Sequence, residues 1–343
     1  MTGFALRDPR RIGVAVLGAG RMAQTHMRTL AGIDNADVVV VADPLEASAR
    51  RGMEVAHARR WTLDPVEAVH DAEVEAVVIV TPTSTHASLI EEALRAGKAV
   101  WTEKPIAQEL ADTQRIVDLW RATGIPVAVG FMRRYDPGYA RAKALIDAGE
   151  LGRIEQFHAY SRDVNPPPLE FLLHAGGSFL DMSVHDLDLA RFLVGEVDEV
   201  HAWAATLFDD RFTQADDWDT AAIMLRFQNG AMGVIETARH STWGYDIRAE
   251  VCGSKNKVTI DADRKTPATI TSGVNLQHDL YADFFDRFDT AYQRELQAFF
   301  ADLAAGRAPL PGPEDALETL RLAVACTRSW RENRPVRLAE VTA

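Results

Sequence analysis

Cysteine is scarce in this sequence, and long apolar runs are missing. The 343-residue chain has two cysteines, Cys252 and Cys326, too few and too far apart for a disulfide framework or a cysteine metal site. We therefore expect a reduced, cytoplasmic setting. No run of about 18 apolar residues is present, so no membrane span is predicted. Residues 1–11 also lack the apolar core of a signal peptide.

The sequence has no excess of positive charge either. Fifty acidic residues face thirty-seven lysines and arginines, which gives a net charge of -13. This balance argues against a nucleic acid or an anionic membrane as a partner and leaves a small molecule as the expected ligand. The length exceeds one ordinary hydrophobic core, so two domains are predicted, residues 1–130 and 131–343.

A glycine-rich turn follows the first predicted strand. Ile12–Leu17 is apolar, and Gly18-Ala19-Gly20-Arg21-Met22-Ala23 comes directly after it, before a helical pattern. This order is the context of a dinucleotide-binding fingerprint with alanine in the third glycine position. Gly18 permits the tight turn and Gly20 lets the backbone approach a pyrophosphate, which the start of the helix then binds. Arg21 and Met22 open that helix and are predicted to contact the cofactor.

The second predicted strand ends in an acidic residue. Residues 37–43 have an apolar middle, as a strand buried on both faces requires. Asp43 lies 23 residues after Gly20, where a carboxylate meets the adenosine ribose. An acid there favours NAD, because it repels the 2′-phosphate of NADP. The alternative is a turn residue before Pro44.

Strands and helices continue to alternate as far as residue 131. The pattern predicts a doubly wound parallel sheet, with Thr81 and His86 after one strand and Glu103-Lys104-Pro105 at the end of another. Proline stops a strand, and ligands bind outside the carboxyl ends of such strands. Lys104 is therefore placed to act on a bound molecule, although a solvated lysine on a loop is the simpler alternative. For His86 we favour a helix cap or a contact at the cofactor's edge.

The order of predicted elements changes in the second half of the chain. Short strands are predicted at 154–160, 197–207, 220–227, 232–237, 248–252 and 257–260, with a hairpin turn at 228–231. These elements, with helices at 280–304 and 314–332, predict an α+β domain with a large, mainly antiparallel open sheet covered by helices on one face. The other face is left for assembly, and we expect a homotetramer.

One predicted helix of this half, residues 176–188, carries an acid and a histidine four residues apart. In a continuous helix Asp181 and His185 share a face, so the carboxylate can orient the imidazole as a general base. In the alternative, Ser178 is the N-cap, Asp181 completes a capping box with it, and His185 is a packed histidine. A metal site from His174, Asp181, His185 and Asp188 is poorly spaced, and none is predicted.

Together these motifs resemble the glucose-fructose oxidoreductase/inositol dehydrogenase/MocA (Gfo/Idh/MocA) family over nearly the whole chain. The matching elements are the glycine fingerprint, Glu103-Lys104-Pro105 and the Asp181/His185 pair. The resemblance implies a Rossmann domain followed by an α/β domain, and a catalytic set without metal. The implied catalytic residues are Lys104, Asp181 and His185, and the implied NAD-binding residues are Gly18, Gly20, Arg21, Met22, Asp43, Thr81, His86, Glu103 and Lys104.

Several stretches are most similar to those of inositol 2-dehydrogenases within the family. They are residues 131–137, 161–163, the proline triplet 166–168 and residues 244–246. This resemblance assigns substrate contacts to Arg133, Asp163 and Tyr245. The chain departs from the pattern at 161–163, because some inositol dehydrogenases have His-Arg-Asn where Ser-Arg-Asp stands here.

The resemblance implies NAD-dependent oxidation of a secondary hydroxyl of a cyclic polyol, myo- or scyllo-inositol, or of a similar sugar. His185, oriented by Asp181, would take the hydroxyl proton, and Lys104 would stabilise the alkoxide. The alternatives are an NAD-dependent glycosidase, a dehydrogenase of another pyranose or anhydrosugar, and a cofactor-sensing regulator without turnover.

Overall fold

The computed structural model of the protein describes residues 4–261 and 264–342, and the chain forms two compact units. Unit 1 contains the chain up to Met132 together with Ala291–Glu318, and unit 2 contains Arg133–Thr290 and Thr319–Thr342. The expected domain division at 130/131 is close to the first change between units. The segment Ala291–Glu318 differs from expectation, because its contacts group it with unit 1.

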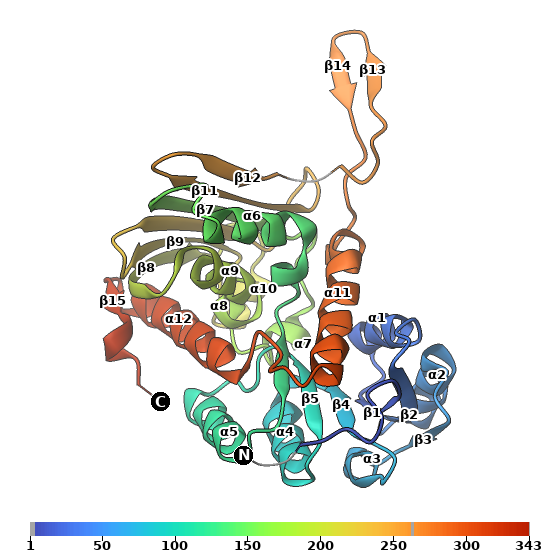
Figure 1. Cartoon of the computed structure of the whole chain (residues 1–343). Helices are drawn as coiled ribbons and strands as arrows, with labels where there is room; N and C mark the ends of the chain where they lie inside the picture. The colour runs from blue at the N-terminus through green and yellow to red at the C-terminus, as the bar shows by residue number, and fades with distance from the viewer. Residues whose placement is uncertain (1–3, 262–263, 343) are drawn as a thin grey trace. The chain divides into compact units, whose positions relative to one another are not determined.

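Unit 1 is built on a six-stranded parallel sheet with the strand order β3-β2-β1-β4-β5-β6 (Figure 1). Its strands are β1 (Ile12–Leu17), β2 (Ala36–Ala42), β3 (Arg60–Thr62), β4 (Ala76–Ile79), β5 (Ala99–Glu103) and β6 (Val127–Gly130). The central strands β1, β4 and most of β5 are fully buried, which explains their continuously apolar sequences. This is the predicted doubly wound sheet.

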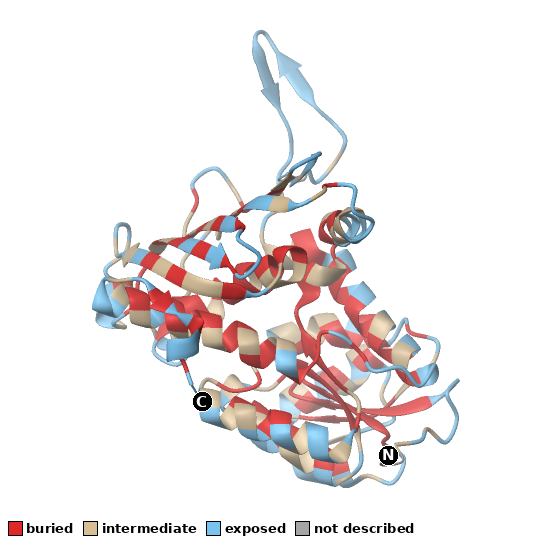
Figure 2. Ribbon diagram, turned by 60° about the vertical axis from the view of Figure 1, so that its left-hand side comes forward, coloured by how far each residue is buried: buried red, intermediate tan, exposed pale blue. Residues whose placement is uncertain are grey.

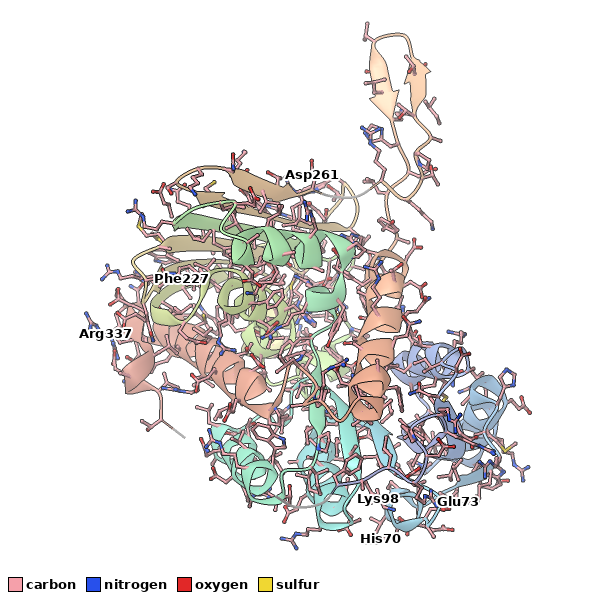
Figure 3. All side chains as sticks on the ribbon, in the orientation of Figure 1. His70, Glu73, Lys98, Phe227, Asp261 and Arg337 are labelled. Atoms are coloured by element: carbon pink, nitrogen blue, oxygen red, sulfur yellow. The ribbon has the colours of Figure 1, made fainter. Side chains whose placement is uncertain are left out.

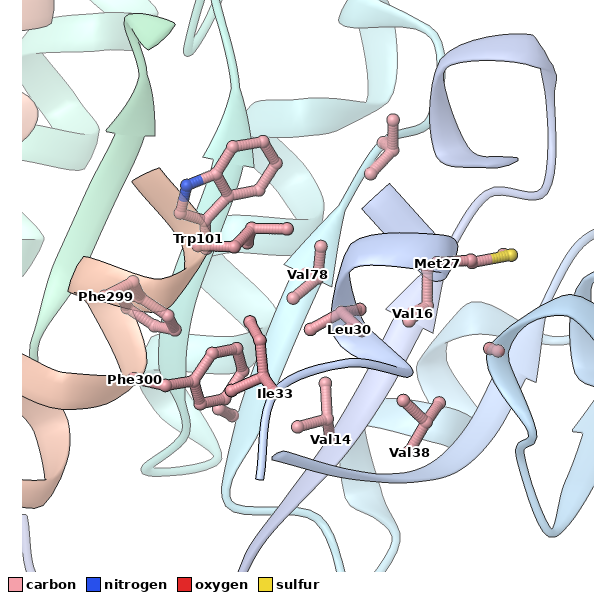
Figure 4. Packing of buried hydrophobic residues seen from close by; sticks show 14 of the residues in the cluster. Val14, Val16, Met27, Leu30, Ile33, Val38, Val78, Trp101, Phe299 and Phe300 are labelled. Carbon is pink, nitrogen blue, oxygen red and sulfur yellow. The ribbon is translucent and has the colours of Figure 1, made fainter. Parts of the chain in front are cut away.

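Helices cover both faces of this sheet. They are α1 (Arg21–Leu30), α2 (Glu46–Ala56), α3 (Pro65–His70), α4 (His86–Arg95), which follows the short helix η1 (Thr83–Thr85), α5 (Leu110–Thr123) and the unit 1 part of α11 (Phe284–Ala304). Figure 4 shows Met27 and Leu30 of α1 with Phe299 and Phe300 of α11 packed against Val16, Val78 and Trp101 of the strands. Helices α3, α4 and α5 pack in sequence along the other face.

Charged side chains gather where the strands of unit 1 begin. Arg59 forms ion pairs with Asp37 and Glu73, and Lys98 donates to the carbonyl oxygens of Asp71 at 3.1 Å and of Val74 at 2.7 Å. Figure 3 labels Glu73 and Lys98 at this end. The ion pairs are largely exposed, so each contributes little stability.

Unit 2 contains a seven-stranded sheet in the order β12-β11-β7-β10-β9-β8-β15. The strands are β7 (Ile154–Arg162), β8 (Val197–Ala205), β9 (Thr220–Phe227), β10 (Met232–Ala238), β11 (Asp246–Gly253), β12 (Lys257–Ile260) and β15 (Val336–Arg337). All neighbouring pairs are antiparallel except β7 and β10, which run parallel. The mainly antiparallel open sheet is therefore confirmed, and Gly230, with φ +88°, makes the expected hairpin turn between β9 and β10.

One face of this sheet is buried and the other is partly exposed. Residues along β9 alternate between buried and more exposed positions, as Figure 2 shows for the sheet. The helices of unit 2 are η2 (Met132–Tyr135, from Arg133 on), α6 (Pro137–Asp147), α7 (Leu169–Leu172), α8 (Ser178–Asp181), α9 (Val184–Val194), α10 (Arg211–Gln214), α12 (Pro313–Glu332, from Thr319 on) and η3 (Leu338–Glu340). The partly exposed face includes Trp203, Met224 and Met232, each at least 45% exposed.

A small separate hairpin was not predicted. Strands β13 (Ile270–Ser272) and β14 (Asn275–Gln277) pair antiparallel with each other, and all their residues are exposed. Its exposed turn contains Gly273, with φ +59°. Across the described ranges, no helix combines the length and the apolar character that a membrane crossing needs.

Candidate active site

The turn after β1 has the geometry that the glycine fingerprint predicts. Gly18 adopts φ +95°, and a Cβ built on it would lie 2.5 Å from the carbonyl oxygen of Val80. Any other L-residue would therefore be strained and would also collide with the backbone that follows β4. This close approach of two chain segments is what requires glycine at position 18.

Gly20 has a different reason to be glycine. Its backbone is extended, with φ −69° and ψ −168°, and a Cβ added there would meet no described atom within 4 Å. Gly20 is the N-cap of α1, its helix has no side-chain cap, and the first turn contains no acidic residue. A helix N-terminus of this kind, here beginning at Arg21 and Met22, is suited to an anion. This part of the chain fits the pyrophosphate of a dinucleotide.

Asp43 ties the end of β2 to the glycine turn. Its Oδ2 accepts a hydrogen bond from Ala19 N at 2.8 Å, and its Oδ1 accepts one from Leu45 N at 2.9 Å. The turn role considered for Asp43 is therefore present. Each carboxylate oxygen retains a lone pair that can accept from a ribose hydroxyl, so the ribose contact stays a prediction.

His86 links the ends of β4 and β5. Its Nδ1 lies 2.8 Å from the carbonyl oxygen of Pro105, its Nε2 lies 2.9 Å from that of Thr81, and the side chain is buried. It opens α4, whose N-cap is Thr85, and Thr85 Oγ1 donates to Thr81 Oγ1 at 2.7 Å. His86 is therefore not the N-cap of α4, but it is the C-cap of the short helix η1, where its backbone N–H donates to the carbonyl oxygen of Thr83. The imidazole holds two loops together, and contacts of Thr81 and His86 with the cofactor stay predictions.

Glu103 is the last residue of β5, and its carboxylate has two different neighbours. Oε1 lies 2.8 Å from Nε2 of the buried His26 on α1, and Oε2 accepts from Lys104 N at 3.2 Å. This arrangement fixes the backbone where Lys104 leaves the sheet, before a cis peptide bond to Pro105. Cofactor contacts of Glu103 and Lys104 stay predictions.

A second, unexpected acid lies near Glu103. Glu295 on α11 is 2% exposed, and neither of its carboxyl oxygens has a hydrogen-bond partner among the described residues. Burial raises its pKa well above the usual value, and the charge of Glu103 raises it further. Glu295 is therefore more easily protonated than an exposed glutamate. The sequence offered no signal for it, because Glu295 sits in an amphipathic helix that could equally expose it.

In unit 2, the predicted helix 176–188 is interrupted. Residues Ser178–Asp181 form α8, Val184–Val194 form α9, and Met182 and Ser183 separate them. Gly177, with φ +95°, is the N-cap of α8, so the predicted N-cap Ser178 is wrong. Ser178 Oγ instead donates to Asp217 at 2.7 Å. The interruption occurs because Ser183 N bonds to the carbonyl oxygen of Ser178, five residues back.

The capping alternative for Asp181 is overturned as well. Asp181 ends α8, and its Oδ2 accepts a 2.7 Å hydrogen bond from Arg239 Nη2. Because the N-cap of α8 is Gly177, Ser178 and Asp181 do not form the capping box considered from the sequence. His185 lies in the first turn of α9, beyond the interruption, and its pairing with Asp181 stays a prediction.

Arg239 brings Asp163 and Asp181 together. Its guanidinium lies 3.4 Å from Asp163 Oδ2 on one side and 2.7 Å from Asp181 Oδ2 on the other. Burial raises the pKa of the Asp163 carboxyl, an effect that Arg239 opposes and Asp181 reinforces. Two predicted site residues are thus neighbours, and the residue that joins them was missed from the sequence.

Arg133 and Tyr245 lie next to this group. Arg133 Nη1 donates to Asp186 at 2.7 Å and to Ser161 at 3.0 Å. Its buried Nε has no hydrogen-bond partner in the described parts of the chain. Burial raises the pKa of the Tyr245 phenol, and its charge interactions include Arg133 and Asp163, so this phenol is a neutral donor. Asp186 was also missed; its signal was an acid next to His185.

Within the ranges that the structure describes, no group of three or more histidine, cysteine, aspartate or glutamate side chains is arranged to hold a metal ion. The polar side chains of unit 2 pair with one another instead.

Comparison with known proteins decides the family. The model of the oxidoreductase family's NAD-binding Rossmann fold matches residues 12–131, and that of the family's C-terminal alpha/beta domain matches residues 143–338. The chain belongs to the Gfo/Idh/MocA oxidoreductase family. The predicted family and fold class are therefore confirmed.

Relatives within the Gfo/Idh/MocA family align over almost the full length. The chain is 38% identical over 330 residues to scyllo-inositol 2-dehydrogenase (NAD(+)) of Bacillus subtilis, with 96% of each chain covered. It is 36% identical to myo-inositol 2-dehydrogenase of Thermotoga maritima, with 96% of this chain and 99% of the relative covered.

A solved structure also aligns with almost the full length of the chain. Scyllo-inositol dehydrogenase of Lactobacillus casei, with bound NAD(H) and scyllo-inositol, has a TM-score of 0.89 and 28% identity, with 96% of this chain and 99% of that chain covered. With the NAD-binding family model, these comparisons confirm the predicted cofactor, NAD, and the predicted NAD-dependent oxidoreductase. The expected homotetramer and cytoplasmic location stay predictions.

Proposed function

We propose that this Gfo/Idh/MocA protein oxidises a secondary ring hydroxyl of a cyclic polyol, myo- or scyllo-inositol, to a ketone with NAD. The observation that carries the proposal is the polar cluster of unit 2. Arg239 donates to Asp163 and Asp181, Arg133 donates to Asp186, and charge interactions link Arg133 to Asp163 and Tyr245. Such a surface suits a ligand with many hydroxyls, because buried polar groups left unpaired are costly. The names of the relatives described above support inositol.

The chemical step assigns one role to each predicted catalytic residue. His185 in its neutral form takes the proton of the ring hydroxyl, and Asp181 stabilises the imidazolium that results. Lys104 stabilises the developing alkoxide by its charge. Bound NAD supplies the acceptor for the hydride that leaves the same carbon.

Three residues are proposed to bind the substrate. Arg133 offers its unsatisfied Nε–H to a hydroxyl oxygen, Tyr245 offers a neutral phenol, and Asp163 accepts from a hydroxyl. A ligand without such hydroxyls would leave these groups unpaired. Linear aliphatic alcohols are therefore expected to be poor substrates.

The test is an NAD-reduction screen that follows NADH absorbance. The panel contains inositol stereoisomers, pyranoses, anhydrosugars and linear alcohols of similar size, each with NAD and with NADP. We expect the highest kcat/KM with an inositol and NAD. Turnover of linear alcohols with none of any ring polyol would contradict the proposal. Release of a sugar from a glycoside without net NADH would support the glycosidase alternative, and no turnover despite NAD binding would support a regulator.

A further inference from the structure

Arg239 occupies the centre of an acidic cluster that nothing in the sequence predicted. The side chain is 6% exposed. It contacts Asp181 at 2.7 Å, Asp163 at 3.4 Å and Ser178 Oγ at 3.3 Å. Ser178 in turn donates to Asp217 at 2.7 Å. One guanidinium thus serves two carboxylates directly and lies close to a third.

The parallel pairing of β7 and β10 explains why these groups meet. Ala238, the last residue of β10, pairs with Arg162, the last residue of β7. Asp163 and Arg239 therefore follow neighbouring strands at the same edge of the sheet, and Asp163 N donates to Ala238 O at 3.0 Å. Asp181, at the end of α8, meets them there. The cluster is fixed by strand register and not by a flexible loop.

The charges in this cluster do not balance. Two carboxylates, Asp163 and Asp181, share one guanidinium, which leaves one negative charge when all three are ionised. The neighbouring pair of Arg133 and Asp186 is balanced within itself, with a 2.7 Å ion pair. Charges a few ångströms apart in a buried site interact strongly, because little water screens them. Any proton carried by a base beside Asp181 therefore responds to the net charge of this group.

We propose that Arg239 is a positioning residue that holds Asp163 and Asp181 together and, through its charge, sets the pH at which His185 becomes the neutral, active base. The inference rests on the proposed function, in which His185 is that base. An uncompensated carboxylate stabilises the imidazolium, and a nearby cation destabilises it. Arg239 therefore keeps His185 neutral, and active, at a lower pH than Asp181 and Asp163 alone would permit.

A set of four proteins, the wild type and three variants, changes the net charge of the cluster in steps of one. With Asp163, Asp181 and Arg239 ionised and the nearby Asp217 unchanged throughout, these three groups carry one net negative charge in the wild type, two in Arg239→Gln, none in Asp163→Asn, and one again in the double variant. The pH at which kcat/KM rises with an inositol substrate should therefore be lowest for Asp163→Asn and highest for Arg239→Gln. The wild type and the double variant should coincide between them. Each step is expected to be on the order of one pH unit.

A matched control is available on the same strand. Arg162 also bridges two acids, Asp246 at 2.8 Å and Glu236 at 3.0 Å, but its side chain alternates with that of Ser161 and points to the other face of β7. Arg162→Gln should leave the pH profile in place. Arg239→Lys, which keeps the charge, should also retain the wild-type profile and thereby separate charge from loss of folding.

The possible results are distinct. Lower melting temperatures and lower kcat with one common pH profile in all variants would show a purely structural arginine and overturn the inference, as would a double variant that does not return to the wild-type profile. If Arg239→Gln does not fold, Asp163→Asn alone must still shift the profile downward. Absence of polyol-dependent NADH formation by the wild type would instead reject the proposed function.

Discussion

The glycine turn of unit 1 and the Arg239 cluster of unit 2 are built from different parts of the polypeptide. In unit 1 the candidate site consists mainly of backbone: a left-handed glycine, a helix N-terminus without a side-chain cap, and the N–H groups to which an aspartate bonds. In unit 2 it consists of side chains in buried ion pairs. Backbone geometry is specified by neighbours in the chain, whereas ion pairs are specified by neighbours in space.

This difference suits the two ligands. A pyrophosphate is the same in every dinucleotide, so dipoles and N–H groups at one helix end suffice to bind it. A polyol is distinguished by the arrangement of its hydroxyls, which requires several donors and acceptors at fixed positions. In the proposed site, buried pairs such as Arg133–Asp186 would hold those positions, because breaking such a pair leaves an uncompensated buried charge.

The largest effect is expected when the proposed base in unit 2 is removed and the NAD site of unit 1 is left intact. His185→Ala should lower kcat by about 10²–10⁴-fold, because general base catalysis is worth that much. Affinity for NAD and the melting temperature should remain near those of the wild type. Steady-state kinetics, NAD titration and thermal unfolding measure the three quantities.

The control for this variant is His201→Ala, which removes an imidazole whose ring centroid lies 4.0 Å from that of Trp203, tilted by 38°, in the sheet of unit 2. Its kcat should be nearly unchanged. A His185→Ala protein with wild-type turnover would end the assignment of the base.

The next prediction is that the two glycines of the turn in unit 1 differ in what their substitution costs, stability in one case and NAD affinity in the other. Gly18→Ala should lower stability by about 1–3 kcal/mol, since the new Cβ would meet the Val80 carbonyl in a left-handed conformation. Gly20→Ala should fold as well as the wild type, because its φ is ordinary and the space is open, but it should weaken NAD binding. Thermal unfolding with and without NAD distinguishes the two variants. Equal losses of stability in both would contradict the different roles assigned to the two glycines.

A smaller effect concerns cofactor choice. Asp43→Ser should reduce the preference for NAD over NADP by about tenfold, or ~1.4 kcal/mol, because a carboxylate no longer repels the 2′-phosphate. Asp43→Asn also removes the charge but keeps one acceptor oxygen, which can serve either Ala19 N or Leu45 N and not both, so it tests the charge with part of the turn retained. The ratio of kcat/KM values for NAD and NADP is the measurement. Equal values for the two cofactors in the wild type would reject the ribose contact.

A further effect concerns Glu295, a buried acid of unit 1 whose carboxyl oxygens have no hydrogen-bond partner among the described residues. Because the pKa of Glu295 is raised in the folded protein, unfolding releases a proton above the unfolded value of about 4.3, and stability falls as pH rises. Glu295→Gln does not titrate, so its advantage over the wild type should grow with pH, by at most about 1.4 kcal/mol per pH unit.

Melting temperatures of the two proteins measured from pH 5 to pH 8 test this sign. Charged and titratable groups near Glu295 are Glu103, which raises its pKa, and His26 and Tyr292, whose rings meet at 5.7 Å. A difference that stays constant with pH would show that Glu295 is ionised in the folded protein.

Local patterns were sufficient for most of the fold. The bounds of β9 and β12 agree with the sequence prediction at both ends, because alternation and a glycine turn act within a few residues. The break between Asp181 and His185 was missed, since every residue there tolerates a helix. Tertiary contacts of Ser178 with Asp217 and Arg239 decide that local conformation.

The sequence by itself determined the glycine turn, the strand that precedes Asp43 and the strand that precedes Lys104 and Pro105. Each depends on conformational limits of single residues and on periods of two or about 3.6 residues, which neighbours impose. Only the tertiary structure decided that Asp163 and Asp181 share Arg239, and that Glu295 is buried near Glu103. The parallel pairing of β7 with β10 brings Asp163 and Arg239 together, and the part of α11 that belongs to unit 1 carries Glu295. These residues are far apart in the sequence, and no sequence periodicity indicates a partner at such distances along the chain.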